Sequence, residues 1–484
     1  MNAQKTLPYA QFFFSLITLF LFATQVKGQE VKGVACIIFA DNNVMLVRDI
    51  LSNCLSFPGG YVDRGETAEQ AAQREAYEET GLRVTVGPQI AHANHSAQFL
   101  CKSIAPIPVL SSQGIETMPV VYALAAPDFS IEIREVYLTK PKLIKPDKYR
   151  FPDQIKLLPP NLSLFSEWQS QATIIGDSAL PINLLHRFEL PLIQQLQSQL
   201  APDADLLFKF FNFLGESKLF FLCVPIIWVF AGWQTGFRSL LLLSISAETV
   251  NILKTLFTLP RPFQFIPNLQ RMEAYGFGMP SGHATVAVVF WGYCWLRFKH
   301  LLPKTYRNPA FLTLSTILIG CAISRVYWGV HFFSDSLAGI LLGLTILFAF
   351  LADEKCGFWH AMENVQKIPC LIYLGIFFGG IFFAPGRLPS QLFGLTVGLF
   401  IGLAYNKTNI LNSNSSQHFS HKLITAFLGI CGIVTVDQFA KLLANQQATG
   451  FKIIFIFLVG YVLIGLWLSV GMRKITNLKL VIHR

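Results

Sequence analysis

The chain has 484 residues, of which 52% are hydrophobic and only 14% are charged, and its formal net charge is +10. This length predicts more than one domain, and the low charge with a positive mean hydropathy predicts a membrane protein. The basic residues lie in short loops between apolar segments, and no basic stretch is interleaved with aromatic residues, so nucleic acid is not an expected partner.

Residues 1–28 contain an apolar stretch, 9–26, that follows Lys5. A stretch of this length is at the lower limit for a membrane span and equally suits a signal peptide, with Val26 and Gly28 as small residues before a cleavage site. The sequence does not distinguish a retained anchor from a cleaved signal, and either one would carry the next domain across the membrane. The third alternative is a helix that packs on the rest of the chain.

Residues 29–160 are predicted to form a soluble domain that holds three of the nine cysteines, Cys36, Cys54 and Cys101. A disulfide between two of them is left open, and no cysteine spacing is typical of a metal site. In its middle, Thr67 with Gln70 predicts the capped start of a helix.

Gly81 predicts the end of that helix. On it, Glu75, Glu78 and Glu79 share one face, where their mutual repulsion favours a cation, and carboxylate oxygens suit Mg²⁺. The structural alternative is a solvated acidic helix face.

The pattern Gly60-x5-Glu66-x7-Arg74-Glu75-x2-Glu78-Glu79-x-Gly81 resembles the Nudix box of hydrolases that act on nucleoside-diphosphate-linked compounds. Its seven fixed positions match, and Ala76 stands where a larger aliphatic residue is more usual. The resemblance implies an α/β domain with a mixed sheet between helices, which hydrolyses a diphosphate-linked small molecule with Mg²⁺ or Mn²⁺. It further implies that the metal is bound by Glu75, Glu78 and Glu79, and that the loop is braced by Gly60, Glu66, Arg74 and Gly81.

Residues 161–217 are predicted to be a linker that ends in an interfacial helix near Phe208 to Leu214. Nine membrane spans are then expected, at about 219–233, 237–259, 283–298, 309–324, 332–352, 368–384, 389–405, 423–441 and 452–472. The first five form a predicted domain over residues 218–355. The last four, in 356–484, contain no recognisable motif.

Three polar blocks lie at the ends of these spans. Lys254 and Arg261 are seven residues apart, so both fit one face of a helix that Pro262 would end. The run Pro280 to His283 opens the next span, where Gly282 would let backbone N–H groups approach an anion.

In the third block, His331 and Asp335 are four residues apart, and a carboxylate at this spacing on a helix can hold one imidazole tautomer. Arg325 lies just before them. Cations, histidines and a carboxylate together indicate a phosphate pocket with a nucleophile and an acid. The structural alternative is interfacial cations and hydrogen-bonded histidines at helix ends.

The three blocks together resemble the signature of the type-2 phosphatidic acid phosphatase superfamily. The resemblance implies that His331 attacks phosphorus, Asp335 orients it and His283 protonates the leaving oxygen. It implies that the phosphoryl oxygens are held by Lys254, Arg261, Arg325, Ser281 and the backbone of Gly282. No metal is expected at this site, because the cations would neutralise the phosphoryl charge.

The order of the spans places the three blocks on one side of the membrane. The opposite side carries Arg238, Arg297, Lys299, Lys304, Arg307, Lys355, Lys367, Arg473, Lys474, Lys479 and Arg484. Because cytoplasmic loops are rich in Lys and Arg, we expect a multi-pass protein of the bacterial inner membrane with both sites on the periplasmic face.

These features predict a bifunctional membrane hydrolase. The membrane site would dephosphorylate a lipid phosphate or diphosphate, with undecaprenyl diphosphate first, then phosphatidylglycerol phosphate or phosphatidic acid. The alternatives are a hydrolase of nucleotide sugars that then releases phosphate from the product, a Nudix fold that senses diphosphates and controls the phosphatase, and a transporter. The oligomeric state stays open.

Overall fold

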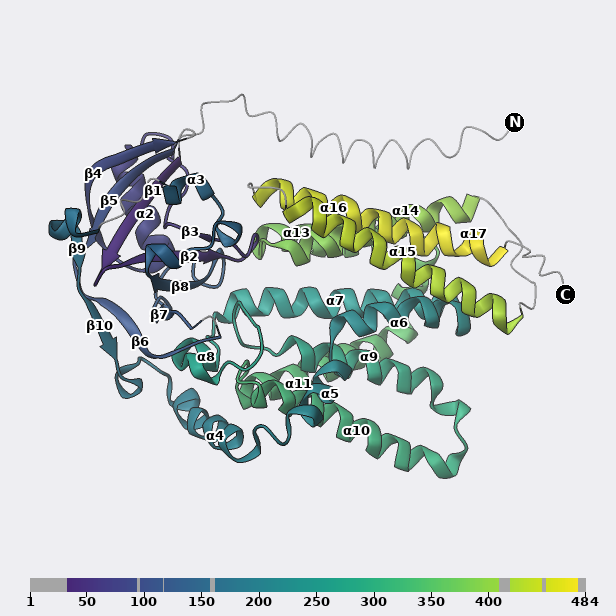
Figure 1. Ribbon diagram of the computed structural model, residues 1–484. Coiled ribbons are helices and arrows are strands. Elements are labelled where there is room, and N and C mark those ends of the chain that lie inside the picture. Colours follow the sequence, from purple (N-terminus) through teal and green to yellow (C-terminus); the bar gives the residue numbers. More distant parts are fainter. Residues whose placement is uncertain are drawn as a thin grey trace, which may run out of the picture.

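The computed structural model describes residues 33–93, 96–115, 117–156, 162–408, 418–445 and 450–477. An α/β domain at the N-terminal side packs against one end of a long helical bundle (Figure 1). The predicted combination of a mixed-sheet domain and an all-helical membrane domain is confirmed. The predicted signal peptide or anchor, residues 1–28, lies outside the described residues.

The N-terminal domain is built on a mixed sheet whose strand order is β10-β6-β7-β8-β2-β1-β5-β4, with β3 paired to β2 and β9 to β1. β1 is parallel to β5 and antiparallel to β2. The strands are β1 (Gly33–Ala40), β2 (Asn43–Asp49), β3 (Leu55–Ser56), β4 (Val84–Ala93), β5 (Ser96–Ser103), β6 (Ile107–Gln113), β7 (Pro119–Val121), β8 (Ile133–Thr139), β9 (Gln169–Ser170) and β10 (Ala172–Ile175).

Helix α2 (Ala68–Thr80) packs on this sheet and begins and ends where the sequence predicts. Thr67 and Gln70 form a reciprocal capping box, and Gly81 closes the helix with a left-handed φ of 73°. Ala71, Ala72 and Ala76 are fully buried against the strands. A small residue at position 76 therefore lets the carboxylate-bearing helix lie close to the sheet.

Part of the predicted linker belongs to this domain. Strands β9 and β10 lie within residues 161–217, yet they pair with β1 and β6. These strands have two and four residues, too few to show a hydrophobic period in sequence. After them come α4 (Leu184–Leu200) and α5 (Asp205–Leu214), the second of which coincides with the predicted interfacial helix.

Helices occupy all nine segments that were predicted to span the membrane. They are α6 (Ser217–Phe230), α7 (Trp233–Phe257), α9 (Gly282–Phe298), α10 (Lys304–Tyr327), α11 (Phe333–Cys356), α13 (Lys367–Phe383), α14 (Arg387–Thr408), α15 (Phe419–Asn445) and α16 (Gly450–Leu466). The shorter helices are α3 (Pro152–Lys156), α8 (Pro262–Phe265), α12 (Phe358–Glu363) and α17 (Met472–Asn477).

Only six of these helices, among the residues described, are long and apolar enough to cross a membrane: α7, α10, α11, α14, α15 and α16. The bent pair α5–α6 would make a seventh. The count is lower than predicted because α9 and α13 have 17 residues each, fewer than the roughly 20 that a bilayer core requires. The chain is a multi-pass membrane protein.

The last four long helices form a unit beside the others. α14 packs closely along α16, because a Cβ at Gly398 would lie 2.1 Å from the carbonyl oxygen of Val462. α13 and α14 contact α7, and α15 contacts α6. This unit therefore lies against the outer side of α6 and α7.

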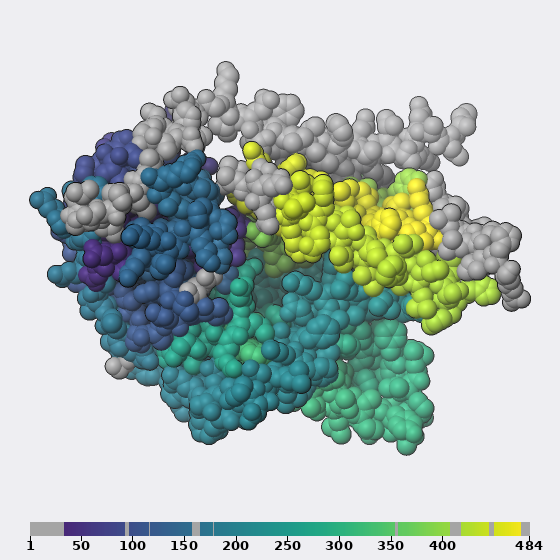
Figure 2. All heavy atoms as spheres, in the orientation of Figure 1, coloured from purple at the N-terminus to yellow at the C-terminus, as the bar shows by residue number. Residues whose placement is uncertain are grey.

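The N-terminal domain contacts the same end of the bundle at which α7 ends and α11 begins (Figures 1 and 2). Leu110 of β6 shares a buried cluster with Phe265, Ile266 and Phe332. The Gln264 amide donates a hydrogen bond to Ser130 Oγ (3.2 Å). The two predicted sites thus lie at one end of the bundle.

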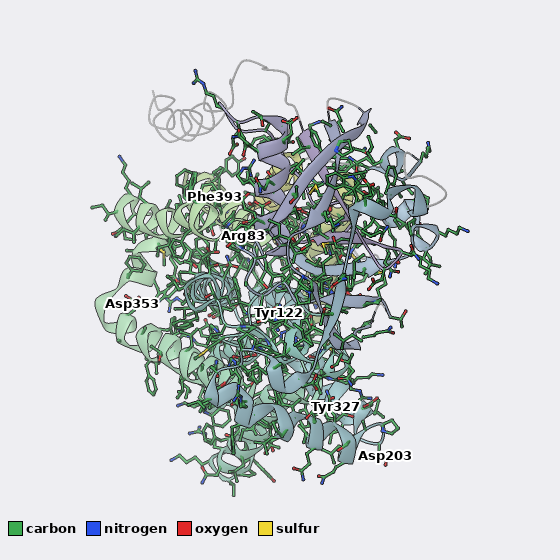
Figure 3. All side chains as sticks on the ribbon, turned by 90° about the vertical axis from the view of Figure 1, so that its left-hand side faces the viewer. Arg83, Tyr122, Asp203, Tyr327, Asp353 and Phe393 are labelled. Carbon is green, nitrogen blue, oxygen red and sulfur yellow. A yellow bond between two sulfur atoms is a disulfide. The ribbon has the colours of Figure 1, made fainter. Side chains whose placement is uncertain are left out.

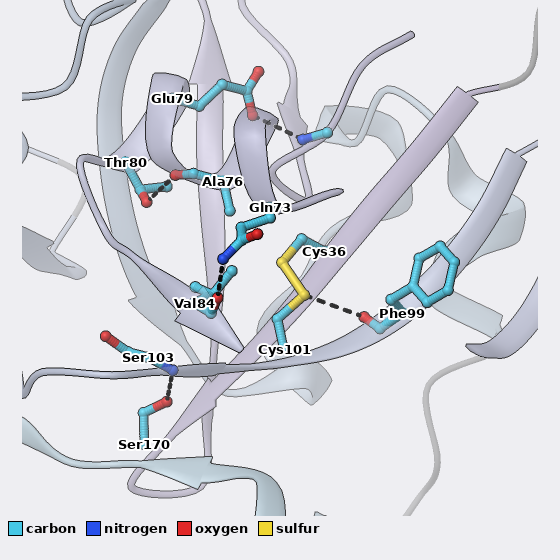
Figure 4. Close-up of a disulfide and its surroundings, with 11 residues drawn as sticks. Cys36, Gln73, Ala76, Glu79, Thr80, Val84, Phe99, Cys101, Ser103 and Ser170 are labelled. Atoms are coloured by element: carbon cyan, nitrogen blue, oxygen red, sulfur yellow. Dashed lines mark hydrogen bonds between the residues drawn. A yellow bond between two sulfur atoms is a disulfide. The ribbon is translucent and has the colours of Figure 1, made fainter. Parts of the chain in front are cut away.

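A disulfide joins Cys36 of β1 to Cys101 of β5 in the core of the N-terminal domain (Figure 4). In the parallel pair β1–β5, Cys36 lies opposite Phe99 and Cys101 lies opposite Ile38, so the two cysteines are diagonal neighbours on one face of the sheet. Cys54 is a free thiol.

Candidate active sites

The three signature blocks come together at the end of the bundle that faces the N-terminal domain. Lys254 lies in the last turn of α7, Ser281 is the N-cap of α9, and Arg325 lies in the last turn of α10. His331 lies two residues before α11, and Asp335 is in the first turn of that helix. The structure therefore brings the predicted phosphate-site residues to one place.

One local prediction is wrong. Lys254 and Arg261 do not share a helix, because α7 ends at Phe257 with Thr258 in the left-handed region (φ 49°). Arg261 instead precedes the short helix α8, where its backbone N–H donates to Gln264 Oε1 (2.8 Å). Its side chain still reaches the pocket, since the turn redirects the chain toward α11.

His331 is held between a carboxylate and a cation. Its Nδ1 lies 3.2 Å from Asp335 Oδ2, and its Nε2 lies 3.1 Å from Arg261 Nη1. Because a guanidinium can only donate, Nε2 accepts and the ring proton is on Nδ1, bonded to Asp335. His331 and Asp335 are 2% and 0% exposed. In this tautomer Nε2 carries a lone pair rather than a proton, so the ring is chemically able to act as a nucleophile once Arg261 takes another partner.

The remaining phosphate-site groups supply donors. Lys254 Nζ donates to the carbonyl oxygens of Phe277 (2.5 Å) and Gly278 (3.0 Å). Among the described residues, Ser281 Oγ and Arg325 Nε are buried without a hydrogen-bond partner. Gly282 begins α9 directly after Ser281. A buried, unpartnered hydroxyl at a helix N-terminus and a buried, unpartnered guanidinium N–H fit a phosphoryl group.

His283 has a partner that the sequence did not reveal. Its Nε2 lies 3.2 Å from Glu216 Oε2, in the bend between α5 and α6. Arg325 Nη1 similarly donates to Asn212 Oδ1 of α5 (2.6 Å). Both partners lie more than 60 residues from the residue that they contact, so no local pattern could have indicated them.

The Nudix-like residues form a second site on α2. Arg74 donates to both carboxylate oxygens of Glu66 (3.1 Å each), to Glu75 (2.8 Å) and to Glu78 (2.7 Å). A Cβ at Gly60 would lie 2.5 Å from Glu75 Oε1, so a larger residue there would displace the Glu75 carboxylate. Arg74, Glu66 and Gly60 thus fix the loop against the helix, and Gly81 ends that helix.

Glu79 is 7% exposed and accepts a hydrogen bond from the Gly59 N–H (2.8 Å), as Figure 4 shows. Burial raises the pKa of Glu79 well above its usual range, and burial likewise raises the pKa of Glu75 to about 7. Asp128 and Glu132 lie near enough to raise the pKa of Glu79 further by charge repulsion. These two carboxyl groups were missed because they lie outside the sequence pattern.

A divalent cation fits the chemistry of this cluster, because hard carboxylate oxygens are the donors that Mg²⁺ prefers and a buried group of carboxylates gains from a positive charge. In the part of the chain that the structure describes, no three His, Cys, Asp or Glu side chains form a ready metal site. Arg74 neutralises Glu75 and Glu78 in this conformation. Glu75, Glu78 and Glu79 would hold the ion after Arg74 releases Glu75 and Glu78.

The two sites define the class of protein: a pocket of cations and histidines at the ends of membrane helices, joined to an α/β domain with a carboxylate cluster. Residues 236–355 match the family model of the PAP2 superfamily, and residues 30–135 match that of the NUDIX domain. The chain therefore combines a NUDIX domain with a PAP2-superfamily domain, and both are families of hydrolases that act on phosphoester or diphosphate bonds.

Three relatives are each similar to part of the chain. The "Probable sphingosine-1-phosphate phosphatase" of Dictyostelium discoideum is 30% identical over 167 residues, which cover 33% of this chain and 41% of the relative. A dihydrosphingosine 1-phosphate phosphatase of Schizosaccharomyces pombe is 24% identical over 279 residues, covering 53% and 66%. An ADP-ribose pyrophosphatase of Methanocaldococcus jannaschii is 45% identical over 49 residues, covering 10% and 29%. The chain thus spans less than two thirds of the length of each.

Proposed function

We propose that the PAP2-superfamily domain dephosphorylates a lipid phosphate or diphosphate through a phosphohistidine. The observation that carries the proposal is the buried His331, whose Nε2 is free of a proton and directed at Arg261 while Asp335 holds Nδ1. Two relatives are named for phosphorylated sphingoid bases, which supports a lipid as the substrate class. A pocket at the ends of membrane helices suits a substrate whose apolar part stays in the bilayer.

In the proposed reaction, the incoming phosphoryl group takes the place of His331 as the partner of Arg261. The Nε2 lone pair forms the N–P bond as the P–O bond to the lipid breaks, and His283 gives its proton to the leaving oxygen. His283 then takes a proton from water, which attacks phosphorus and breaks the N–P bond. Arg261, Arg325, Lys254, Ser281 and the Gly282 backbone would hold the phosphoryl oxygens throughout.

The substrates proposed first are undecaprenyl diphosphate, then phosphatidylglycerol phosphate and phosphatidic acid. Phosphate release from each by the full-length protein in detergent, with and without EDTA, tests the proposal, and a sphingoid base phosphate is added because of the relatives. We expect release from at least one lipid, and the same rate with EDTA, since the pocket supplies its own cations. Release that disappears with EDTA would reject the metal-free site.

We propose that the NUDIX domain hydrolyses a diphosphate-linked small molecule, with Mg²⁺ or Mn²⁺ held by Glu75, Glu78 and Glu79. The bound ion would screen the diphosphate and lower the pKa of an attacking water. The intact carboxylate set and the match of residues 30–135 to the NUDIX model support this activity.

A second candidate is a NUDIX fold that senses diphosphates without cleaving them. It is favoured by the ion pairs of Arg74, which occupy Glu75 and Glu78. The contact between Gln264, which caps the Arg261 N–H, and Ser130 of the NUDIX side would link such a sensor to the phosphatase.

Both sites are proposed to face the periplasm of a bacterial inner membrane. The disulfide Cys36–Cys101, the shared end of the bundle and the basic loops at the opposite end support this orientation. We expect an alkaline phosphatase fused after Gly176, which is exposed, to be active, and a fusion in the loop 299–303 to be inactive. The reverse pattern would place both sites in the cytoplasm.

A further inference from the structure

Helix α4 connects the membrane surface with the loop that carries the nucleophile. It lies on the outside of the molecule, beneath the sheet domain and across the end of the bundle (Figures 1 and 2). The three-block signature does not include any residue of α4. One face of this helix is apolar and exposed, and the opposite face is buried against the start of α11.

The outward face of the first turns is apolar. Leu184, Leu185, Phe188 and Leu192 are 86%, 55%, 69% and 39% exposed. Their spacing places them on one stripe of the helix, and Arg187 is exposed beside it. Four large apolar side chains exposed together on an amphipathic helix are typical of a helix that lies in the membrane interface.

The position of the stripe identifies the occupant as lipid. α4 contacts the start of α11, which is long and apolar enough to cross a membrane. On α11, Phe333, Leu337 and Leu341 are 36%, 58% and 56% exposed and must face acyl chains if the helix crosses the bilayer. The stripe of α4 therefore continues an apolar surface at the end of a span, where the interface lies.

The inward face of α4 holds the start of α11. Glu189, only 5% exposed, accepts hydrogen bonds from the backbone N–H of Ser334 (2.8 Å) and from its hydroxyl (3.0 Å). The His186 ring stacks on Phe332 with centroids 3.8 Å apart. These contacts lie on both neighbours of Phe333 and within three residues of His331.

A second attachment fixes the chain on the other side of the nucleophile. Gln197 donates from Nε2 to the carbonyl oxygens of Tyr327 (2.8 Å) and Leu269 (2.9 Å). Asp203, in the turn after α4, and Tyr327, at the end of α10, lie toward the same edge of the molecule in Figure 3. The loop 328–332 is thus held by α4 before and after His331.

We propose that α4 is a lipid-bound helix that positions the nucleophile through Glu189. The carboxylate caps the first turn of α11 with a charge-assisted bond, which fixes the Phe332 to Asp335 turn and hence the ring of His331. Seating of the apolar stripe in a bilayer would hold α4 in place, so that the pocket is fully ordered only in a membrane. This inference rests on the proposed lipid phosphatase function, because the effect of α4 is measured as phosphate release at that site.

The test compares full-length wild type with Glu189→Ala, Glu189→Gln and the matched control Gln195→Ala, an exposed residue of the same helix. We expect Glu189→Ala to lower kcat for phosphatidic acid by about a hundredfold with KM unchanged, because a small displacement of the nucleophile is costly. Glu189→Gln keeps one acceptor and should recover part of the loss. Gln195→Ala should match wild type.

The lipid contact is tested with Phe188→Ser. We expect its rate to fall severalfold on phosphatidic acid in phosphatidylcholine vesicles, but not on dispersed dioctanoyl phosphatidic acid in detergent. An equal loss on both substrates, or none on vesicles, would overturn the lipid-bound role. Equal kcat for Glu189→Ala and wild type would overturn the positioning role.

Hydrogen exchange gives a readout that does not need activity. The Ser334 amide should exchange faster in Glu189→Ala than in wild type or Gln195→Ala, and an unchanged rate would overturn the tether. A wild type that releases no phosphate from any lipid would instead reject the proposed function, whatever the exchange rate shows.

Discussion

Replacing His331 with alanine should abolish the release of phosphate from lipid substrates, with kcat lowered about a thousandfold or more. The Nε2 atom accepts from Arg261 while Asp335 holds the opposite ring nitrogen, so its lone pair is directed into the pocket. Its removal leaves the cations in place, so substrate would still bind. We therefore expect KM to change far less than kcat.

The measurement is phosphate release by full-length protein from the lipid that the wild type prefers. His300→Ala is the matched control, because His300 is exposed at the far end of α9. Alanine also removes the acceptor for Arg261, so His331→Asn serves as a second variant whose amide oxygen can still accept from the guanidinium. Activity near the wild-type value in both variants would exclude His331 as the nucleophile.

Local sequence patterns predicted the parts of both sites that short-range geometry controls. The capping pair Thr67–Gln70 and the left-handed Gly81 set the ends of α2, and these in turn place Glu75, Glu78 and Glu79 on one helix. His331 and Asp335 likewise contact each other at a spacing of four residues. Each of these interactions is confined to one or two turns of backbone, which is why a single sequence indicates them.

The remaining features depend on which distant segments meet. Asn212 and Glu216 each pair with a residue of the signature, and Glu189 pairs with Ser334 beside it. All three partners come from the stretch that was predicted to be a linker and an interfacial helix. The pairing of Cys36 with Cys101, rather than with Cys54, follows from the register of β1 and β5. Strand register and helix packing are tertiary properties, so the composition of these stretches did not indicate their partners.

The path of the chain after α7 is another feature that local sequence spacing did not predict. The seven-residue interval between Lys254 and Arg261 suits a helix, but α7 ends at Phe257 and a loop delivers Arg261 instead. Both routes bring a cation to the phosphate pocket. The spacing was therefore informative about the site and misleading about the local structure.

Glu79→Gln should abolish metal-dependent hydrolysis of a diphosphate-linked substrate while leaving lipid phosphate release intact. The amide has the shape of the carboxyl group, and its oxygen can accept the Gly59 N–H, so α2 should keep its position. A neutral amide oxygen is a much weaker ligand for Mg²⁺ than a carboxylate, and we expect a loss of roughly a hundredfold.

Measuring diphosphate hydrolysis and lipid phosphate release together distinguishes a catalytic NUDIX domain from a NUDIX fold that only senses diphosphates. Hydrolysis of ADP-ribose and of a nucleotide sugar is measured with added Mg²⁺, and lipid phosphate release is measured in the same preparation. Glu69→Gln is the control, because Glu69 is exposed on the first turn of α2. If only the first activity is lost, the NUDIX domain is an independent hydrolase. If wild type cleaves neither diphosphate but Glu79→Gln alters the rate of the lipid phosphatase, the sensor is the better account, and the Ser130–Gln264 contact offers a route to Arg261.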